Sequence, residues 1–279
     1  MPPSVFLSSR RFPGARNPLA GTPWHDGDGA IRARAEPRPW EARAVSCAVP
    51  SEPDSVADRL AAVRARIDAA ALAASRDPGS ITLVAVSKGQ PPEALRAAYA
   101  AGQRVFGENY AQEVVRKHAA IEDLPEVRFH FIGGLQRNKA KEVVPRVAMV
   151  ESVDREDLAR ELDRRATAAG RRLDVLIEVN VGGEASKSGA SPADLPAIVR
   201  AVRAMPGLAL RGLMTIPPEV EDPAEARPFF AALRALAAEH GLEALSMGMS
   251  HDFEAAIAEG ATIVRVGTAI FGARSYPAR

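Results

Sequence analysis

The chain has 279 residues, 47% of them hydrophobic, and its 36 basic and 35 acidic side chains nearly balance, so bulk charge does not favour nucleic acid or an anionic membrane as partner. A single cysteine, Cys47, excludes disulfides within the chain, and five histidines without metal-binding spacing give no support for a metal site. No apolar run reaches the roughly 18 residues of a membrane helix, so we expect a cytoplasmic globular protein that binds a small molecule.

Residues 1–52 differ from the rest of the chain. They lack helical or strand periodicity and carry eight prolines, seven arginines and no lysine, so we predict a disordered extension. Its first 24 residues weakly resemble an organelle transit peptide, although the bias of a GC-rich genome or a misassigned start codon would give the same pattern. We expect residues 53–279 to form one domain.

An amphipathic helix is predicted first in this domain. Its apolar residues recur at helical spacing, and they are Val56, Leu60, Val63 and Ile67. Short runs rich in β-branched residues then alternate with amphipathic segments. The eight predicted strands cover residues 81–86, 104–106, 127–132, 147–151, 173–180, 208–215, 244–247 and 263–266.

These strands start at a mean interval of roughly 26 residues, which suits repeated βα units and parallel pairing. Eight units close into a single (β/α)8 TIM barrel. An open doubly wound sheet is the alternative, but it usually has a G-x-G-x-x-G turn after its first strand, where this chain reads SKGQPP. In a TIM barrel, chemistry gathers at the carboxyl ends of the strands.

The first strand ends on a lysine, Lys88. Such an amine is often a solvated charge. In a partly apolar mouth, however, its pKa falls and the neutral amine can form a Schiff base with an aldehyde. We therefore treat Lys88 as a candidate binding residue.

Strands seven and eight end in LSMGMS and VRVGTAIFG. Hydroxyls and closely approachable backbone amides occur here together, at Ser246, Gly248, Gly267 and Thr268. A phosphate would be bound by such groups at the start of a short helix, which is the usual phosphate location in this fold. The alternative is that the glycines only permit tight turns.

Two further side chains belong to this end of the barrel. The two-residue period of a strand puts Arg265 on the same face as Gly267, and a buried guanidinium needs an acceptor. That acceptor is a ligand ring nitrogen or, alternatively, Glu178 or Glu151 in a structural ion pair. Asn109, after strand two, can donate to a ring oxygen or cap the next helix.

A phosphate, an aldehyde and a ring nitrogen describe pyridoxal 5'-phosphate. Five stretches also closely resemble the pyridoxal phosphate homeostasis protein family, over residues 54–276. They are AVSKGQP, FGENYAQE, HFIGGLQRNKA, GLMTI and LSMGMSHDFEAAIAEGATIVRVGTAIFGAR. The resemblance implies a single barrel like the N-terminal domain of bacterial alanine racemase.

The same resemblance implies roles for individual residues. Lys88 would be the Schiff-base lysine, Arg265 would face the pyridine nitrogen, and Asn109 would lie beside the ring. The phosphate ligands would be Ser246, Gly248, Gly267 and Thr268. Lys187, within EASKSG, matches a further family lysine near the mouth.

The sequence departs from the family pattern at three positions. Gly89, Phe129 and Gly134 stand where Thr, Trp and a larger residue are common. These departures concern contacts at the edge of the site and leave the lysine and phosphate positions intact.

The resemblance also bears on catalysis. In alanine racemases a tyrosine from an additional β-domain acts on the opposite ring face, and we expect no such domain because the chain ends at Arg279. Tyr110, beside Asn109, keeps the question open. An arginine at the ring nitrogen weakens the cofactor as an electron sink. We therefore expect no catalytic residue, but a carrier that holds the cofactor as a Schiff base, maintains its free concentration and affects amino-acid and keto-acid balance.

Three alternatives are kept. A racemase or decarboxylase of the same barrel type would turn over amino acids. A Schiff-base aldolase would also use a lysine and a phosphate site. A nucleic-acid contact through Arg137, Lys139 and Lys141 is the weakest, since basic residues on one helix face are usually solvated. We expect a monomer whose other partners are pyridoxal phosphate-dependent client enzymes.

Overall fold

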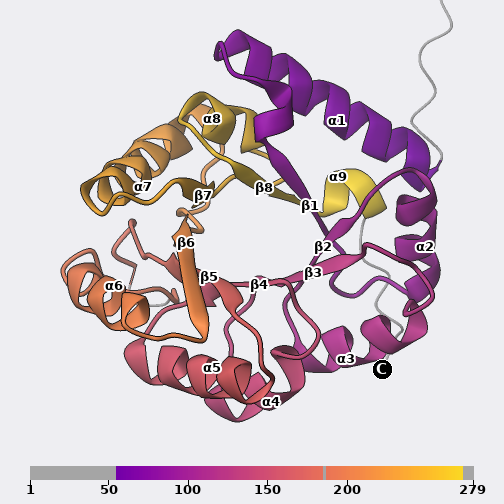
Figure 1. Ribbon diagram of the computed structural model, residues 1–279. Coiled ribbons are helices and arrows are strands. Elements are labelled where there is room, and N and C mark those ends of the chain that lie inside the picture. Colours follow the sequence, from indigo (N-terminus) through magenta and orange to yellow (C-terminus); the bar gives the residue numbers. More distant parts are fainter. Residues whose placement is uncertain (1–54, 185–186, 273–279) are drawn as a thin grey trace, which may run out of the picture. The chain divides into compact units, whose positions relative to one another are not determined.

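The computed structural model describes residues 55–184 and 187–272. Within them, eight strands form a closed barrel in chain order, with every neighbouring pair parallel (Figure 1). The strands are β1 Thr82–Val86, β2 Val105–Glu108, β3 Arg128–Phe131, β4 Met149–Val153, β5 Leu173–Glu178, β6 Leu208–Met214, β7 Ala244–Ser246 and β8 Ile263–Val266. The predicted TIM barrel is confirmed. The predicted extension over residues 1–52 lies outside the described residues, so it and the domain boundary stay predictions.

Helices surround the barrel and connect its strands (Figure 1). The α-helices are α1 Val56–Ala73, α2 Pro92–Ala100, α3 Ala111–Ala120, α4 Ala140–Val143, α5 Glu156–Ala168, α6 Leu195–Arg203, α7 Arg227–Glu239, α8 Phe253–Ala258 and α9 Thr268–Phe271. Three short 3₁₀ turns are η1 Pro78–Ser80, η2 Arg137–Lys139 and η3 Pro223–Ala226.

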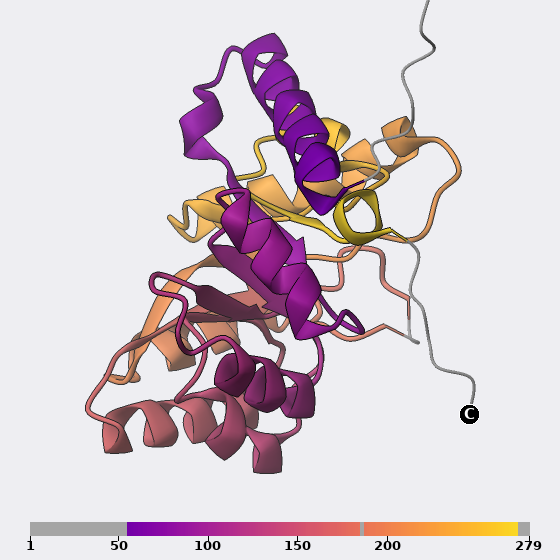
Figure 2. The same cartoon turned by 90° about the vertical axis from the view of Figure 1, so that its right-hand side faces the viewer.

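Helix α1 completes the ring although it precedes the first strand. Ser55 caps it, because its side chain accepts a hydrogen bond from the Asp58 amide at 3.1 Å. The helix packs against α8, α9 and α2, and so takes the place that a helix after β8 would occupy. Figure 2 shows the short α9 beside it, where Arg59 Nε donates to the carbonyl oxygen of Ile270 at 2.7 Å.

Pairing of the first and last strands closes the barrel. Thr82 lies opposite Ile263, and Ala85 lies opposite Val266. This closure brings the turn after β1 next to the turn after β8. Residues at the two ends of the domain therefore meet at one mouth.

Alternation along the strands separates an outer core from the barrel interior. On β8, Val264 and Val266 belong to the core between the strands and the helices, whereas Ile263 faces inward. The inner apolar cluster consists of Val84, Leu176, Met214 and Ile263. The predicted division of β8 into two faces is thus confirmed.

We expect Gly212→Ala to destabilise the barrel. Gly212 lies on β6 opposite Ala244 of β7, and a methyl group at Gly212 would overlap the Ala244 carbonyl oxygen. Relief requires movement of strand backbone, so the loss in free energy of unfolding should reach about 2 kcal/mol or more. Urea denaturation would measure it. Gly134→Ala is the matched control, since a methyl group there meets no atom within 4 Å, and equal losses in both variants would contradict the argument.

Candidate functional site

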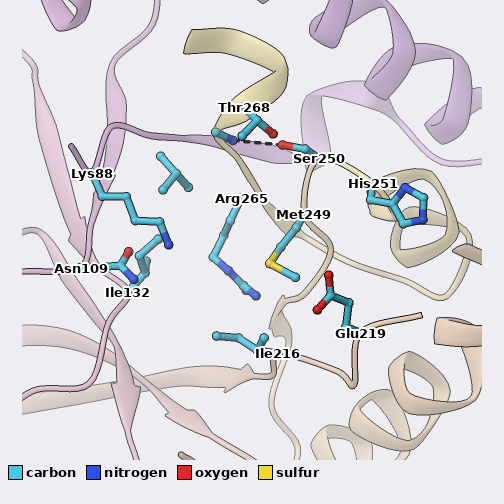
Figure 3. A pocket seen from close by; sticks show the side chains of 12 residues that line it. Lys88, Asn109, Ile132, Ile216, Glu219, Met249, Ser250, His251, Arg265 and Thr268 are labelled. Carbon is cyan, nitrogen blue, oxygen red and sulfur yellow. Dashed lines mark hydrogen bonds between the residues drawn. The ribbon is translucent and has the colours of Figure 1, made fainter. Parts of the chain in front are cut away.

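A cavity of about 430 Å³ lies at the carboxyl end of the barrel (Figure 3). It is lined by Val86, Lys88, Asn109, Ile132, Ile216, Glu219, Met249, Ser250, His251, Arg265, Gly267 and Thr268. Most of the predicted site residues are among them, namely Lys88, Asn109, Arg265, Gly267 and Thr268. The structure therefore gathers residues from the ends of β1, β2 and β8 around one space.

One side of the cavity carries an amine and an amide. Lys88 follows β1 and Asn109 follows β2, and both side chains point into the cavity (Figure 3). The Asn109 Oδ1 atom is buried and has no hydrogen-bond partner within the described part of the chain. A buried amide oxygen without a partner costs free energy, which a ligand that donates a hydrogen bond would recover.

The neighbouring part of the cavity wall, after β8, has groups suited to an anion. The chain leaves β8 at Gly267, and α9 begins at Thr268, where the first amides of a helix lack intrahelical acceptors. The Gly267 amide lies 3.3 Å from Ser250 Oγ, so this hydroxyl is held at the same corner. Two hydroxyls and exposed backbone amides can together bind a phosphate.

Arg265 forms the floor of the cavity and is held by a buried hydrogen-bond chain. Its Nη1 donates to Ser246 Oγ at 2.5 Å, and its Nη2 donates to the Thr215 carbonyl oxygen at 2.8 Å. Ser246 Oγ in turn donates to Glu151 Oε2 at 2.5 Å, and Glu151 Oε1 lies 2.6 Å from His130 Nδ1. The guanidinium therefore has a fixed orientation inside the barrel.

The charges in this chain compensate one another. Burial opposes ionisation of Glu151, yet the hydrogen bond and charge of His130, with the charge of Arg265, lower the pKa of Glu151 below its usual value. Burial lowers the pKa of Arg265, while Glu151 and Glu178 counteract that shift. Arg265 couples to Glu151 through Ser246 rather than by direct contact, and it also lines the cavity, so its contact with a ligand ring nitrogen stays a prediction.

Two predicted phosphate ligands do not line the cavity. Ser246 is fully buried, and its hydroxyl lies between Arg265 and Glu151. Gly248 has a φ of +92°, and a methyl group there would lie 2.6 Å from the Ala256 Cβ, so this glycine serves a tight turn. Ser246 therefore holds Arg265 in place, and Gly248 shapes the turn after β7.

Sequence reasoning missed Ser250, which takes the corner where Ser246 was expected. It lies in the same LSMGMS motif, which was the available signal, but two serines four residues apart could not be distinguished without the turn at Gly248. The apolar rim was also missed. Ile216 and Met249 line the cavity although they are 39% and 36% exposed.

Lys187 lies at a neighbouring cavity of about 710 Å³. Its Nζ donates to the Pro217 carbonyl oxygen at 2.8 Å and pairs with Glu184 Oε2 at 2.7 Å. The two cavities share Ile216 and Met249 in their walls. Lys187 is thus near the mouth, as expected, and its role stays a prediction.

Glu178 is buried at the end of β5. Burial raises its pKa to about 7, the charge of Asp154 adds to the rise, and the charge of Arg265 reduces it. Glu178 is thus a second buried carboxyl near Arg265, and its pKa is raised whereas that of Glu151 is lowered.

In residues 55–184 and 187–272, the His, Cys, Asp and Glu side chains form no group of three or more that could hold a metal ion. In the same residues, none of the helices has the length and apolarity needed to cross a bilayer.

Comparison with known proteins identifies the family. The family model described as "Alanine racemase, N-terminal domain" matches residues 59–275. A Pyridoxal phosphate homeostasis protein of Pseudomonas aeruginosa is 51% identical over 226 residues, which cover 80% of this chain and 98% of that protein. The chain belongs to the pyridoxal phosphate homeostasis protein family. An Escherichia coli K12 member of this family is 45% identical over 233 residues, again covering 80% of this chain and 98% of the relative.

Solved structures agree with this membership. PipY of Synechococcus elongatus PCC7942, with pyridoxal phosphate bound, matches with a TM-score of 0.69 and 41% identity over 78% of this chain and 100% of PipY. Alanine racemase of Streptomyces coelicolor matches with a TM-score of 0.59 and 25% identity over 76% of this chain and 58% of the racemase. The racemase barrel is thus the common architecture, and PipY is similar along its whole length.

We expect Glu178→Gln to alter the pH dependence of stability. The folded pKa of about 7 lies above the ordinary value of 4.5, so this carboxyl favours folding below about pH 4.5, and that contribution is lost as the pH rises through 7. Glutamine does not ionise, so the variant should gain unfolding free energy over the wild type at pH 8, on the order of 3 kcal/mol. Urea unfolding from pH 5 to pH 8 would measure this gain.

Glu161→Gln is the control for this measurement. Hydrogen bonds from Arg164 and Arg165 lower the pKa of Glu161 to about 2, so its ionised form stabilises the fold. This control should lose stability at pH 8. An equal gain in both variants would refute a specific effect of burial at Glu178.

Proposed function

We propose that this protein binds pyridoxal 5'-phosphate through Lys88 and acts as a carrier that maintains the cellular supply of this cofactor. The observation that carries the proposal is that an amine, a fixed guanidinium and an anion corner line one cavity. They belong to Lys88, to Arg265, and to Ser250 with Gly267 and Thr268. The homeostasis proteins and PipY, which carries the same cofactor, support it.

The residues present fit this cofactor. A cavity of about 430 Å³ lies in the range of small-molecule sites. Ser250 and Thr268 offer hydroxyls and the first amides of α9 offer donors to the phosphate, while the Gly267 amide holds Ser250 in place. Arg265 offers a donor to the ring nitrogen. The buried Oδ1 atom of Asn109, which has no partner among the described residues, can accept a hydrogen bond from a ring substituent.

Lys88 would provide the covalent link. When bound, the cofactor supplies an aldehyde that condenses with an amine. The Lys88 Nζ would form a C=N bond to the aldehyde carbon, and its two hydrogens would leave with the aldehyde oxygen as water. Only the neutral amine reacts with an aldehyde.

Arg265 favours a carrier over an enzyme. A guanidinium fixed by Ser246 and Thr215 can donate a hydrogen bond to the ring nitrogen, but it keeps its proton. It would therefore leave the ring nitrogen unprotonated and would not increase the electron withdrawal that amino-acid chemistry needs. The rim formed by Ile216 and Met249 is partly exposed to solvent, which suits release. Transfer to client enzymes, a cytoplasmic location and a monomeric state are further parts of this proposal.

We expect the purified protein with pyridoxal phosphate to show a visible absorbance band that borohydride abolishes, with the reduced adduct on the Lys88 peptide. Lys88→Ala should lose the band, because the other lysines do not line this cavity in the described chain. Lys187→Ala is the matched control and should keep the band. A full band in Lys88→Ala would move the covalent site elsewhere, and a protein that never takes up the cofactor would favour the sugar-phosphate aldolase.

We expect no amino-acid turnover above that of the free cofactor, because Arg265 does not promote electron withdrawal by the ring. The loaded protein would be incubated with L-alanine and other amino acids, and racemisation and decarboxylation would be followed by optical rotation and product analysis. Turnover well above the free-cofactor control would favour the racemase or decarboxylase alternative.

A further inference from the structure

The turn that carries Lys88 is held on both sides by helix α3. Lys117 Nζ donates to the Ser87 carbonyl oxygen at 2.6 Å, on one side of Lys88. On the other side, the Gly89 amide donates to Glu113 Oε2 at 2.8 Å. The residues before and after Lys88 are thus both tied to side chains one helical turn apart on α3.

These side chains form a buried charged cluster. Lys117 is fully buried, and besides Ser87 its ammonium donates to Glu108 Oε1 and to Glu113 Oε2, each at 2.7 Å. Its three N–H groups therefore have three acceptors. Glu108 is also fully buried, whereas the Glu113 side chain is 19% exposed.

Such a cluster is not explained by stability alone. Desolvating charges costs several kcal/mol per ion, and apolar residues of similar volume often give equal or greater stability. The same cluster, however, gives the backbone beside Lys88 two charge-assisted hydrogen bonds, which define its conformation. The role of the cluster that stability does not explain is therefore to fix the conformation of the backbone beside Lys88.

Glu108 extends the cluster to a second residue of the cavity. Its Oε1 accepts from Ser87 Oγ at 2.5 Å, which joins the end of β2 to the end of β1. The next residue is Asn109, whose side chain lines the cavity with Lys88. Burial raises the pKa of Glu108 to about 7, and the Lys117 charge and hydrogen bond limit the rise.

We propose that Lys117, with Glu108 and Glu113, is a positioning device that aims the Lys88 amine at the aldehyde by clamping the Ser87 and Gly89 backbone. This inference rests on the proposed function, because it assumes that Lys88 is the reacting amine. The cluster does not touch the cavity itself: the residues that line it include Lys88 and Asn109 but none of the three charged side chains. Loss of the clamp should therefore impair the covalent step and spare the non-covalent fit of the ligand.

The test compares two ligands in the full-length protein. One is pyridoxal 5'-phosphate, and the other is its analogue with a methyl group in place of the aldehyde, which binds without a covalent bond. In Glu113→Ala, which removes the acceptor of the Gly89 amide, adduct formation with pyridoxal phosphate should slow and weaken roughly tenfold, while analogue affinity stays within about twofold. Glu113→Gln, which keeps an acceptor oxygen, should recover part of the loss.

A matched control distinguishes positioning from general helix stability. Glu161 and Arg165 form an i,i+4 pair on α5, as Glu113 and Lys117 do on α3. The difference is that Glu161 accepts from Arg164 and Arg165 of its own helix, whereas Glu113 accepts from the Gly89 amide beside Lys88. Glu161→Ala should leave adduct formation unchanged, with thermal unfolding followed for every variant. Lys117→Met supplies a second variant and should give at least the effect of Glu113→Ala.

The outcomes separate this inference from the proposed function. If the wild-type protein forms no adduct on Lys88, the proposed function fails. If it does, but Glu113→Ala and Lys117→Met form the adduct as rapidly and tightly as the wild type, the positioning role is refuted. Equal losses of pyridoxal phosphate and of the analogue would refute it too, since that result indicates general damage to the cavity.

Discussion

The parallel pairing of β1 with β8 is the constraint on which the site depends. Val84 lies opposite Arg265, about 180 residues further along the chain. Because parallel strands end at the same edge, this register puts the turn after β1 beside the turn after β8. Lys88 and the Gly267–Thr268 corner share a cavity for this reason alone. Helix α1 protects the seam by packing against α8, α9 and α2.

The interior of the barrel is organised around a cation. An arginine on an inward position of β8 must be compensated, and Glu151 of β4 does so through Ser246 of β7 and with support from His130 of β3. Residues of β3, β4 and β7 thus form one hydrogen-bond chain that ends on the guanidinium. The barrel interior therefore contains this hydrogen-bond chain as well as the apolar cluster of Val84, Leu176, Met214 and Ile263.

The charged cluster on α3 has a comparable role on the other side of the cavity. There the cation is Lys117, and its acceptors come from β1, β2 and its own helix. In the first case the buried cation is Arg265, whose own side chain is held in place and lines the cavity. In the second case the buried cation is Lys117, which holds the backbone beside Lys88. Buried charges thus fix the positions of groups at the cavity, because a buried hydrogen-bonded ion pair tolerates few alternative arrangements.

Much of the fold could be predicted because its signals are local. Strands followed from β-branched runs, helices from apolar stripes such as Leu60, Val63 and Ile67, and the barrel from the regular spacing of the units. Boundaries were less accurate: β4 begins at Met149, two residues later than predicted, although the Ala148 amide already bonds to β3. The candidate residues at strand ends, Lys88 and Thr268 among them, followed from the rule that barrels place chemistry there.

The sequence by itself determined the alternation of strands and helices and the identity of the amine, the arginine and the glycine corner, since each is set by neighbours within a few residues. Tertiary structure alone decided which serine faces the cavity, because a left-handed turn at Gly248 separates buried Ser246 from Ser250. It also decided that Lys117 is buried. A lysine four residues after a glutamate is usually a solvated pair on a helix, and only the approach of β1 and β2 removes water from it.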